Sequence, residues 1–236
     1  MSASVEAGPS PFALLFAPDR GMERHARVGR ALRFFLFAWL CSILLGAATA
    51  YRVDARSSTL RKLETSGQLQ TMSDRQVADE THNAERVAEV GSVAKGVVGA
   101  PVQLGSAAIA LLALTWFLRG RVKGNAVVPV AATTLLPGAL ANLLDAVSAF
   151  RHDSLPPEGV PLVPRTLGAI LPFFGHPLMD PWLKLSNAVD FFSLWAAVMM
   201  AFGVAAVGQI PKRRALPGTL IAWICYQLLT RVAMNG

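Results

Sequence analysis

Charged side chains are scarce in this chain. They make up 16% of its 236 residues, whereas a soluble domain averages about 25%. Hydrophobic residues make up 53%, and the mean hydropathy is +0.43. This balance excludes a disordered, a fibrous or an ordinary soluble protein. It predicts an all-α fold, namely a polytopic helical bundle embedded in a lipid bilayer.

Cysteines and catalytic motifs are also scarce. The two cysteines, Cys41 and Cys225, both lie in apolar runs, where each is interpreted as a small packing residue. The four histidines are far apart, and no spacing of Cys, His, Asp or Glu is typical of a zinc site. Phosphate-binding glycine loops, paired-histidine metal motifs and nucleophile elbows are missing too. The sequence therefore predicts a protein that is not an enzyme and uses no metal or cofactor.

Five apolar stretches are long enough to cross a bilayer core of roughly 30 Å, which needs about 20 helical residues. We expect these spans at about residues 31–50, 97–118, 126–150, 188–210 and 216–234. Prolines inside the third span are tolerated when neighbouring helices satisfy the freed carbonyls. The fifth span is interrupted near its end by Arg231. The prediction is a membrane domain over residues 31–236 with about five transmembrane helices.

The first span has an alternative interpretation as a signal peptide, because Ala48-Thr49-Ala50 resembles a cleavage site. About 30 residues precede it, however, and the apolar run is longer than the usual 7–15-residue signal core. We therefore expect an uncleaved span. Residues 1–30 then form an N-terminal segment with a short amphipathic stretch.

Basic residues indicate the orientation of the chain. Two short loops carry basic residues and no acidic ones: Arg119, Arg121, Lys123, Lys212, Arg213 and Arg214. Both loops lie on the side of the N-terminus, and the positive-inside rule places that side in the cytoplasm. An odd number of spans puts the C-terminus outside. We expect a multi-pass protein of the inner (plasma) membrane.

The net charge of +7 is explained by this orientation. Nucleic acid is not an expected partner, because no basic stretch carries interleaved aromatic residues.

The first outer loop, residues 51–96, is long, polar and predicted to be helical. Ser58 can cap a short helix that stops at Gly67, and Ser73 with Gln76 has the spacing of a capping box. The loop is interpreted as a solvated helical hairpin on the membrane surface. A docking surface for an extracytoplasmic partner is the alternative.

The second outer segment, residues 151–187, is rich in proline. Its apolar stretch TLGAILPFFG is too short to span, so we expect it to lie on the surface or to re-enter the membrane. Trp182 is typical of an aromatic anchor at the outer interface.

Two pairs of polar residues lie at the outer ends of predicted spans. Asn142 and Asp145 lie near the end of the third span, and Asn187 and Asp190 at the start of the fourth. The i,i+3 spacing places each pair on one helix face, and both at similar depth. The simplest interpretation of the second pair is local: Asn187 caps the helix, and Asp190 favours its first turn.

Asp145 needs a partner. A carboxylate near a helix C-terminus is disfavoured, and at mid-span it costs about 2.5–3.5 kcal/mol. Basic residues on the same side are Arg151, Arg165 and Lys184. Arg151 follows at i+6, off the same helix face, so we expect an ion pair with Arg165 or Lys184. An ion or substrate site and simple exposure at the interface are the alternatives.

Small residues recur at every fourth position along the fourth span: Ser193, Ala197, Ala201 and Ala205. Such a stripe lets another helix approach closely. We expect this face to pack within the chain, and a homodimer interface is the alternative.

Two segments carry a resemblance to a known family. The first runs from Pro11-Phe12 through Pro18-Asp19-Arg20-Gly21-Met22. The second is NAVDFFSLW at residues 187–195, followed by a small-residue helix and the basic turn Pro211-Lys212-Arg213-Arg214. They resemble the entry segment and the penultimate span of the Yip-one family of Ypt-interacting membrane proteins, bacterial type. The resemblance implies five spans and an accessory role beside export-type ABC transporters and their adaptors. It supplies no catalytic residues.

Two functions follow as hypotheses. The first is a non-enzymatic membrane scaffold or accessory subunit that acts through contacts with a membrane protein partner. The alternative is a small transporter or channel that uses Asp145 and Asp190, with prolines breaking the third span.

Overall fold

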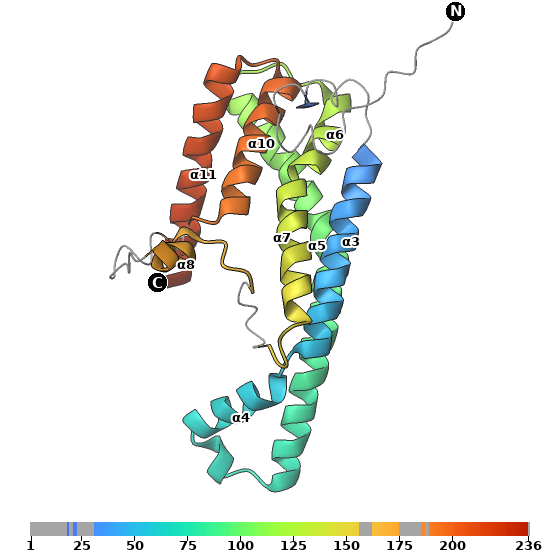
Figure 1. The fold of residues 1–236 in the computed structure, drawn as a ribbon, viewed down its shortest axis with the longest axis vertical. Helices are drawn as coiled ribbons and strands as arrows, with labels where there is room; N and C mark the ends of the chain where they lie inside the picture. Colours follow the sequence, from blue (N-terminus) through green and yellow to red (C-terminus); the bar gives the residue numbers. More distant parts are fainter. Residues whose placement is uncertain are drawn as a thin grey trace, which may run out of the picture. The chain divides into compact units, whose positions relative to one another are not determined.

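The computed structural model describes residues 31–155, 162–174 and 189–235, together with Pro18, Gly21, Met22 and Ser186. Within this part the chain is almost entirely helical, and its only β pairings are two isolated bridges. The elements in Figure 1 are α3 (Ala31–Arg52), α4 (Ala55–Thr65), η1 (Gln68–Gln70), α5 (Asp74–Phe117), α6 (Gly124–Thr134), α7 (Leu136–Ala149), α8 (Leu167–Ile170), η2 (Leu171–Phe174), α10 (Phe191–Gly208) and α11 (Lys212–Asn235).

Four helical stretches among the described residues are long and apolar enough to cross a membrane. They are α3, α5, the pair α6–α7 over residues 124–149, and α10. These stretches contain or overlap the first four predicted spans, so the prediction of an all-α membrane bundle is confirmed. Helix α11 has 24 residues but is not among the four. A fifth span at residues 216–234 stays a prediction.

Internal contacts divide the chain into two compact units. Residues 1–38, 102–138 and 165–236 form the first unit, and residues 39–101 and 139–164 form the second. Each unit is described by itself.

In the second unit, the predicted outer hairpin does not end where the membrane span begins. A single helix, α5, runs from Asp74 to Phe117 over 44 residues, which is about 66 Å of helix and twice the thickness of a bilayer core. The predicted capping box is present at its start. The Ser73 N–H donates to Gln76 Oε1 at 2.9 Å, and the Gln76 N–H donates to Ser73 Oγ at 3.4 Å.

Helix α5 stays continuous although Pro101 lies inside it. Proline has no N–H, so the carbonyl four residues earlier, that of Val97, loses its helical partner. The indole Nε1 of Trp39 donates to this Val97 oxygen at 2.7 Å. A side chain of α3 therefore satisfies the carbonyl that Pro101 frees.

The backbones of α3 and α5 touch where both helices carry small residues four positions apart. A Cβ added to Gly46 would lie 2.7 Å from the Ser92 carbonyl oxygen and 2.9 Å from Gly96 Cα. A Cβ on Gly96 would lie 2.9 Å from the Ser42 carbonyl oxygen. Ser42-xxx-Gly46 and Ser92-xxx-Gly96 thus form a close antiparallel crossing of the small-xxx-small kind.

This crossing fixes how far α5 projects past α3. Arg52 ends α3 six residues after Gly46, so it lies level with α5 at about residue 88. Residues 74–87 of α5 then continue about 20 Å beyond the end of α3, as Figure 1 shows.

Helix α4 begins earlier than predicted. Its N-cap is Asp54 rather than Ser58, because the Asp54 carboxylate accepts hydrogen bonds from the Ser57 hydroxyl at 2.7 Å and the Ser57 N–H at 3.0 Å. These two bonds lower the pKa of Asp54. The predicted stop is confirmed: α4 ends at Thr65, and Gly67 adopts the left-handed conformation with φ 71°.

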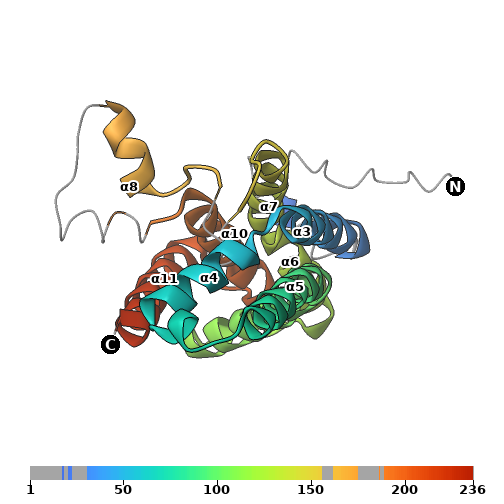
Figure 2. The ribbon, with the colours of Figure 1, turned by 90° about the horizontal axis from the view of Figure 1, so that it is seen from below.

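In the first unit, α10 packs against α6 and α11. The contact with α6 is close, because a Cβ on Gly203 would lie 2.7 Å from Val130 Cγ1. The apolar outer stretch forms only the short helices α8 and η2, as its length predicts, and α8 stands away from α10 and α11 (Figure 2).

Candidate functional site: polar anchors of residues 151–191

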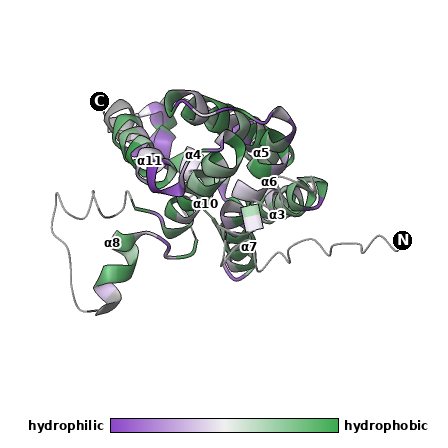
Figure 3. Cartoon of the chain, turned by 90° about the horizontal axis from the view of Figure 1, so that it is seen from above, coloured by the Kyte–Doolittle hydropathy of each residue, from purple (hydrophilic) through white to green (hydrophobic). Residues whose placement is uncertain are grey.

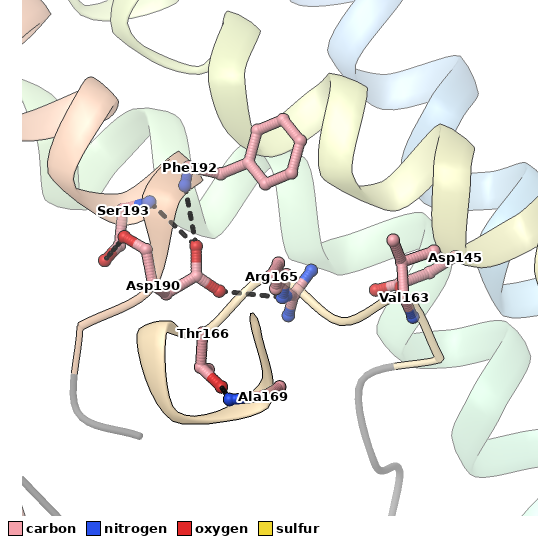
Figure 4. Close-up of polar contacts among 8 residues, drawn as sticks. All are labelled: Asp145, Val163, Arg165, Thr166, Ala169, Asp190, Phe192 and Ser193. Carbon is pink, nitrogen blue, oxygen red and sulfur yellow. Dashed lines mark hydrogen bonds and ion pairs between the residues drawn. The ribbon is translucent and has the colours of Figure 1, made fainter. Parts of the chain in front are cut away.

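Asp190 is the N-cap of α10. Its Oδ1 accepts hydrogen bonds from the N–H groups of Phe192 at 2.8 Å and Ser193 at 3.1 Å, as Figure 4 shows. The sequence assigned this role to Asn187, with Asp190 in the first turn. The helix instead begins at Phe191, and Asn187 lies outside the described residues. Asp190 satisfies two N–H groups that have no partner inside the helix.

The second carboxylate oxygen of Asp190 binds Arg165. The distance from Arg165 Nε to Asp190 Oδ2 is 2.7 Å, and both side chains are 22% exposed. The backbone reinforces this ion pair on either side. The Phe191 N–H donates to the Arg165 carbonyl, and the Leu167 N–H donates to the Val189 carbonyl, each at 3.0 Å. The segment before α8 is therefore clamped to the start of α10.

Thr166 extends the clamp into α8. Its Oγ1 accepts a hydrogen bond from the Ala169 N–H at 3.2 Å and caps that helix. Residues 165–167 thus connect the start of α8 to the start of α10 through the Arg165 side chain, the Thr166 cap and two backbone hydrogen bonds. Figure 4 shows the contacts of the Arg165 and Thr166 side chains. We name residues 165–167 and 189–191 the helix-start clamp.

Asp145 lies in the second unit and is only 6% exposed. Its Oδ1 accepts a hydrogen bond from the Val163 N–H at 3.2 Å. Asn142, one turn earlier, is half-buried. Asp145 therefore holds Val163 to α7, and Val163 lies in a non-helical part of the chain.

Leu155 is tied to the end of α3. The Leu155 N–H donates to the Arg52 carbonyl, and the Asp54 N–H donates to the Leu155 carbonyl, both at 2.8 Å. Leu155 also belongs to a buried apolar cluster with Ala48, Ala146 and Ala149. Leu45 and Leu162 pack against this cluster.

The predicted ion pair of Asp145 stays a prediction. Of its two expected partners, Arg165 is ion-paired with Asp190, and Lys184 lies outside the described residues. Sequence reasoning missed the pair between Arg165 and Asp190. The available signal was weak, because Arg165 and Asp190 are far apart in the sequence and Asp180 and Lys184 lie between them.

The chemistry of these groups is that of structural anchors. The described contacts of both aspartates are mainly with backbone N–H donors, and hydrogen bonds between a carboxylate and such donors are strong. Among the described residues, no group of three His, Cys, Asp or Glu side chains is arranged to hold a metal ion.

The small-residue stripe of α10 is largely covered by the chain itself. Ala197, Ala201 and Ala205 are 6%, 1% and 8% exposed, while Ser193 donates its hydroxyl to the Asp190 carbonyl at 3.0 Å. This burial favours packing within the chain over a homodimer interface.

Long apolar helices joined by polar anchors define a multi-pass membrane protein of the all-helical class. The chain belongs to the Yip1 family: a sequence model described as the Yip1 domain matches residues 12–232. This match confirms the family that the two resembling segments indicated. Comparisons with curated proteins and with solved structures gave no significant match.

Separate substitutions can distinguish the two tasks of Asp190. Asp190→Asn keeps a good N-cap and removes the charge, so it should lower stability by about 1–2 kcal/mol through the orphaned Arg165. Asp190→Ala also removes the cap and should cost about 1 kcal/mol more. Thermal unfolding of purified protein in detergent measures both.

Arg165→Gln provides the control for the ion pair. In that background Asp190→Asn should cost much less than in the parent, because no unpaired charge remains. Equal losses in the two backgrounds would show that the 2.7 Å contact contributes nothing to stability.

Proposed function

We propose that this Yip1-family membrane protein is a non-enzymatic scaffold or accessory subunit that binds a membrane protein partner through residues 55–87, which we name the helical arm. One observation carries the proposal. The acidic side chains that a transport path would use make structural contacts, whereas the arm leaves apolar side chains uncovered.

Few side chains of the arm are buried. Only Ala55, Leu63 and Thr81 are buried among residues 55–87, where η1 joins α4 to α5 (Figure 1). Leu69 at its tip is 39% exposed, and Val87 on α5 is 72% exposed. A projecting helix that keeps apolar side chains in water gains free energy when a partner covers them.

The proposal also includes the orientation of the chain in the membrane and the class of the partner protein. The two basic loops favour a cytoplasmic N-terminus in an inner membrane, which places the arm on the extracytoplasmic side. The family resemblance makes an export-type ABC transporter or its adaptor the first candidate partner. The carboxylates of Asp145 and Asp190 remain the residues that a transporter or channel would use.

Charge substitutions on the arm test the proposal. Leu69→Glu and Val87→Glu place a charge on exposed apolar positions, so the stability of the protein should change by less than about 0.5 kcal/mol. Recovery of an ABC transporter subunit after crosslinking in native membranes should fall at least about tenfold. Quantitative mass spectrometry of the purified crosslinked material measures the recovery.

Ala78→Glu and His82→Glu provide the matched control, because both residues are exposed on another face of α5. These variants should retain the partner. Equal recovery from all variants would exclude the arm as the docking surface. Ion or substrate flux in liposomes that is abolished by Asp145→Asn with unchanged stability would favour a transporter instead.

A further inference from the structure

Two loops that are far apart in the sequence meet at one end of the first unit. The Arg121 N–H donates to the Gly208 carbonyl at 2.9 Å, and the Lys123 N–H donates to the Val207 carbonyl at 3.0 Å. The α5–α6 loop is thereby fastened to the end of α10, where the α10–α11 loop begins. Both loops lie at the upper end of the helices in Figure 1.

The junction collects six basic side chains, which we name the basic patch: Arg119, Arg121, Lys123, Lys212, Arg213 and Arg214. All six are exposed. Among the described residues of the first unit, the only acidic side chain is Asp190, and it is ion-paired with Arg165.

Helix ends add to the positive potential of the patch. Helices α6 and α11 both begin here, at Gly124 and Lys212, and neither has an acidic residue in its first turn. Lys123 is the N-cap of α6 and makes no side-chain capping bond. A helix N-terminus carries about half a positive charge, so basic residues there repel the dipole as well as one another. An external anion would relieve both repulsions.

Aromatic residues indicate the depth of the patch. Trp116 and Phe117, at the end of α5, are 80% and 75% exposed. Exposed aromatic side chains at the end of a transmembrane helix are typical of the membrane–water interface. Arg119 follows within three residues, which places the basic patch at the level of lipid headgroups. Figure 3 views this end of the helices, with hydrophilic segments in purple.

We propose that the basic patch is a binding site for the phosphate headgroup of anionic phospholipids. Basic clusters at the membrane surface attract anionic lipids, with a free energy that grows with each Lys or Arg. The patch supplies six such residues from two loops joined by backbone hydrogen bonds, so their charges act on one headgroup region. The same charges could instead serve only to orient the chain under the positive-inside rule, which needs no bound lipid. The experiment below distinguishes lipid binding from this orienting role.

The experiment uses the full chain in a neutral detergent. Phosphatidylglycerol or phosphatidylcholine is added in mixed micelles, and native mass spectrometry measures the lipid that stays bound. Phosphatidylglycerol should bind at least about tenfold more tightly than phosphatidylcholine. Its retention should fall as NaCl rises toward about 0.5 M, because salt screens exposed charges.

Two triple variants remove half of the patch each. Arg119→Gln/Arg121→Gln/Lys123→Gln and Lys212→Gln/Arg213→Gln/Arg214→Gln should each weaken phosphatidylglycerol binding about tenfold or more. The control, Arg56→Gln/Arg61→Gln/Lys62→Gln, removes three exposed basic side chains from α4 and should leave binding unchanged. If one loop variant fails to fold, the other variant and the salt titration of the parent still test the site.

Three results would overturn the proposal. Equal retention of the two lipids would leave the charges with an orienting role only. An equal loss of phosphatidylglycerol binding in the α4 control variant and in the loop variants would show that binding depends only on net charge. Displacement of the lipid by millimolar inorganic phosphate would assign the patch to a soluble anion rather than to a membrane lipid.

Discussion

Gly46→Ala should lower the thermal stability of the protein sharply. The new Cβ would lie 2.7 Å from the Ser92 carbonyl oxygen and 2.9 Å from Gly96 Cα, and both are backbone atoms that cannot rotate away. The helices must separate, and overpacking of this kind costs about 1–3 kcal/mol. For a chain of this length, we expect the unfolding midpoint in detergent to fall by roughly 5 °C.

Gly91→Ala is the matched control in the same pair of helices. Nothing lies within 4 Å of a Cβ at Gly91, so this variant should unfold at or slightly above the temperature of the parent. Gly96→Ala, whose Cβ would lie 2.9 Å from the Ser42 carbonyl oxygen, should behave like Gly46→Ala. If all three alanine variants have the same unfolding midpoint, the α3–α5 crossing is not close.

Trp39→Phe should also destabilise the protein, by about 1–3 kcal/mol. The substitution keeps an aromatic ring and removes the indole N–H that bonds the Val97 carbonyl at 2.7 Å. A carbonyl left without a donor in the bilayer has no water to replace it. Pro101 is the reason that the carbonyl needs this donor, because it lacks an N–H.

Pro101→Ala should therefore rescue Trp39→Phe. Alanine restores the helical hydrogen bond to Val97, so the loss caused by Trp39→Phe should shrink by at least about 1 kcal/mol in this background. A double-mutant cycle of thermal unfolding in detergent measures the coupling. An undiminished loss would mean that Trp39 stabilises the protein by packing alone.

Much of the fold could be predicted because its signals are local. The transfer free energy of an apolar run identified α3, α6–α7 and α10 as membrane spans. The Ser73–Gln76 capping box and the stop at Gly67 depend on residues within a few positions of one another, and both are present. The hydropathy signal for a membrane span is weaker in α11, because Gln227 and Arg231 interrupt its apolar residues.

Contacts between distant residues could not be predicted. Periodicity showed neither that Trp39 reaches Val97 nor that Arg165 pairs with Asp190. Their partners depend on the register of one helix against another. That register is fixed by close packing, here by glycines whose missing side chains let two backbones touch.

The sequence by itself determined that this protein is an all-helical membrane protein with two purely basic loops on one side, because hydropathy and charge act residue by residue. Only the tertiary structure decided that α5 runs unbroken from the arm into the membrane and that the two loops form one patch. The patch depends on backbone hydrogen bonds between the two loops, and in α5 the Val97 carbonyl freed by Pro101 accepts a hydrogen bond from Trp39. Such bonds have a partner only after the helices have packed.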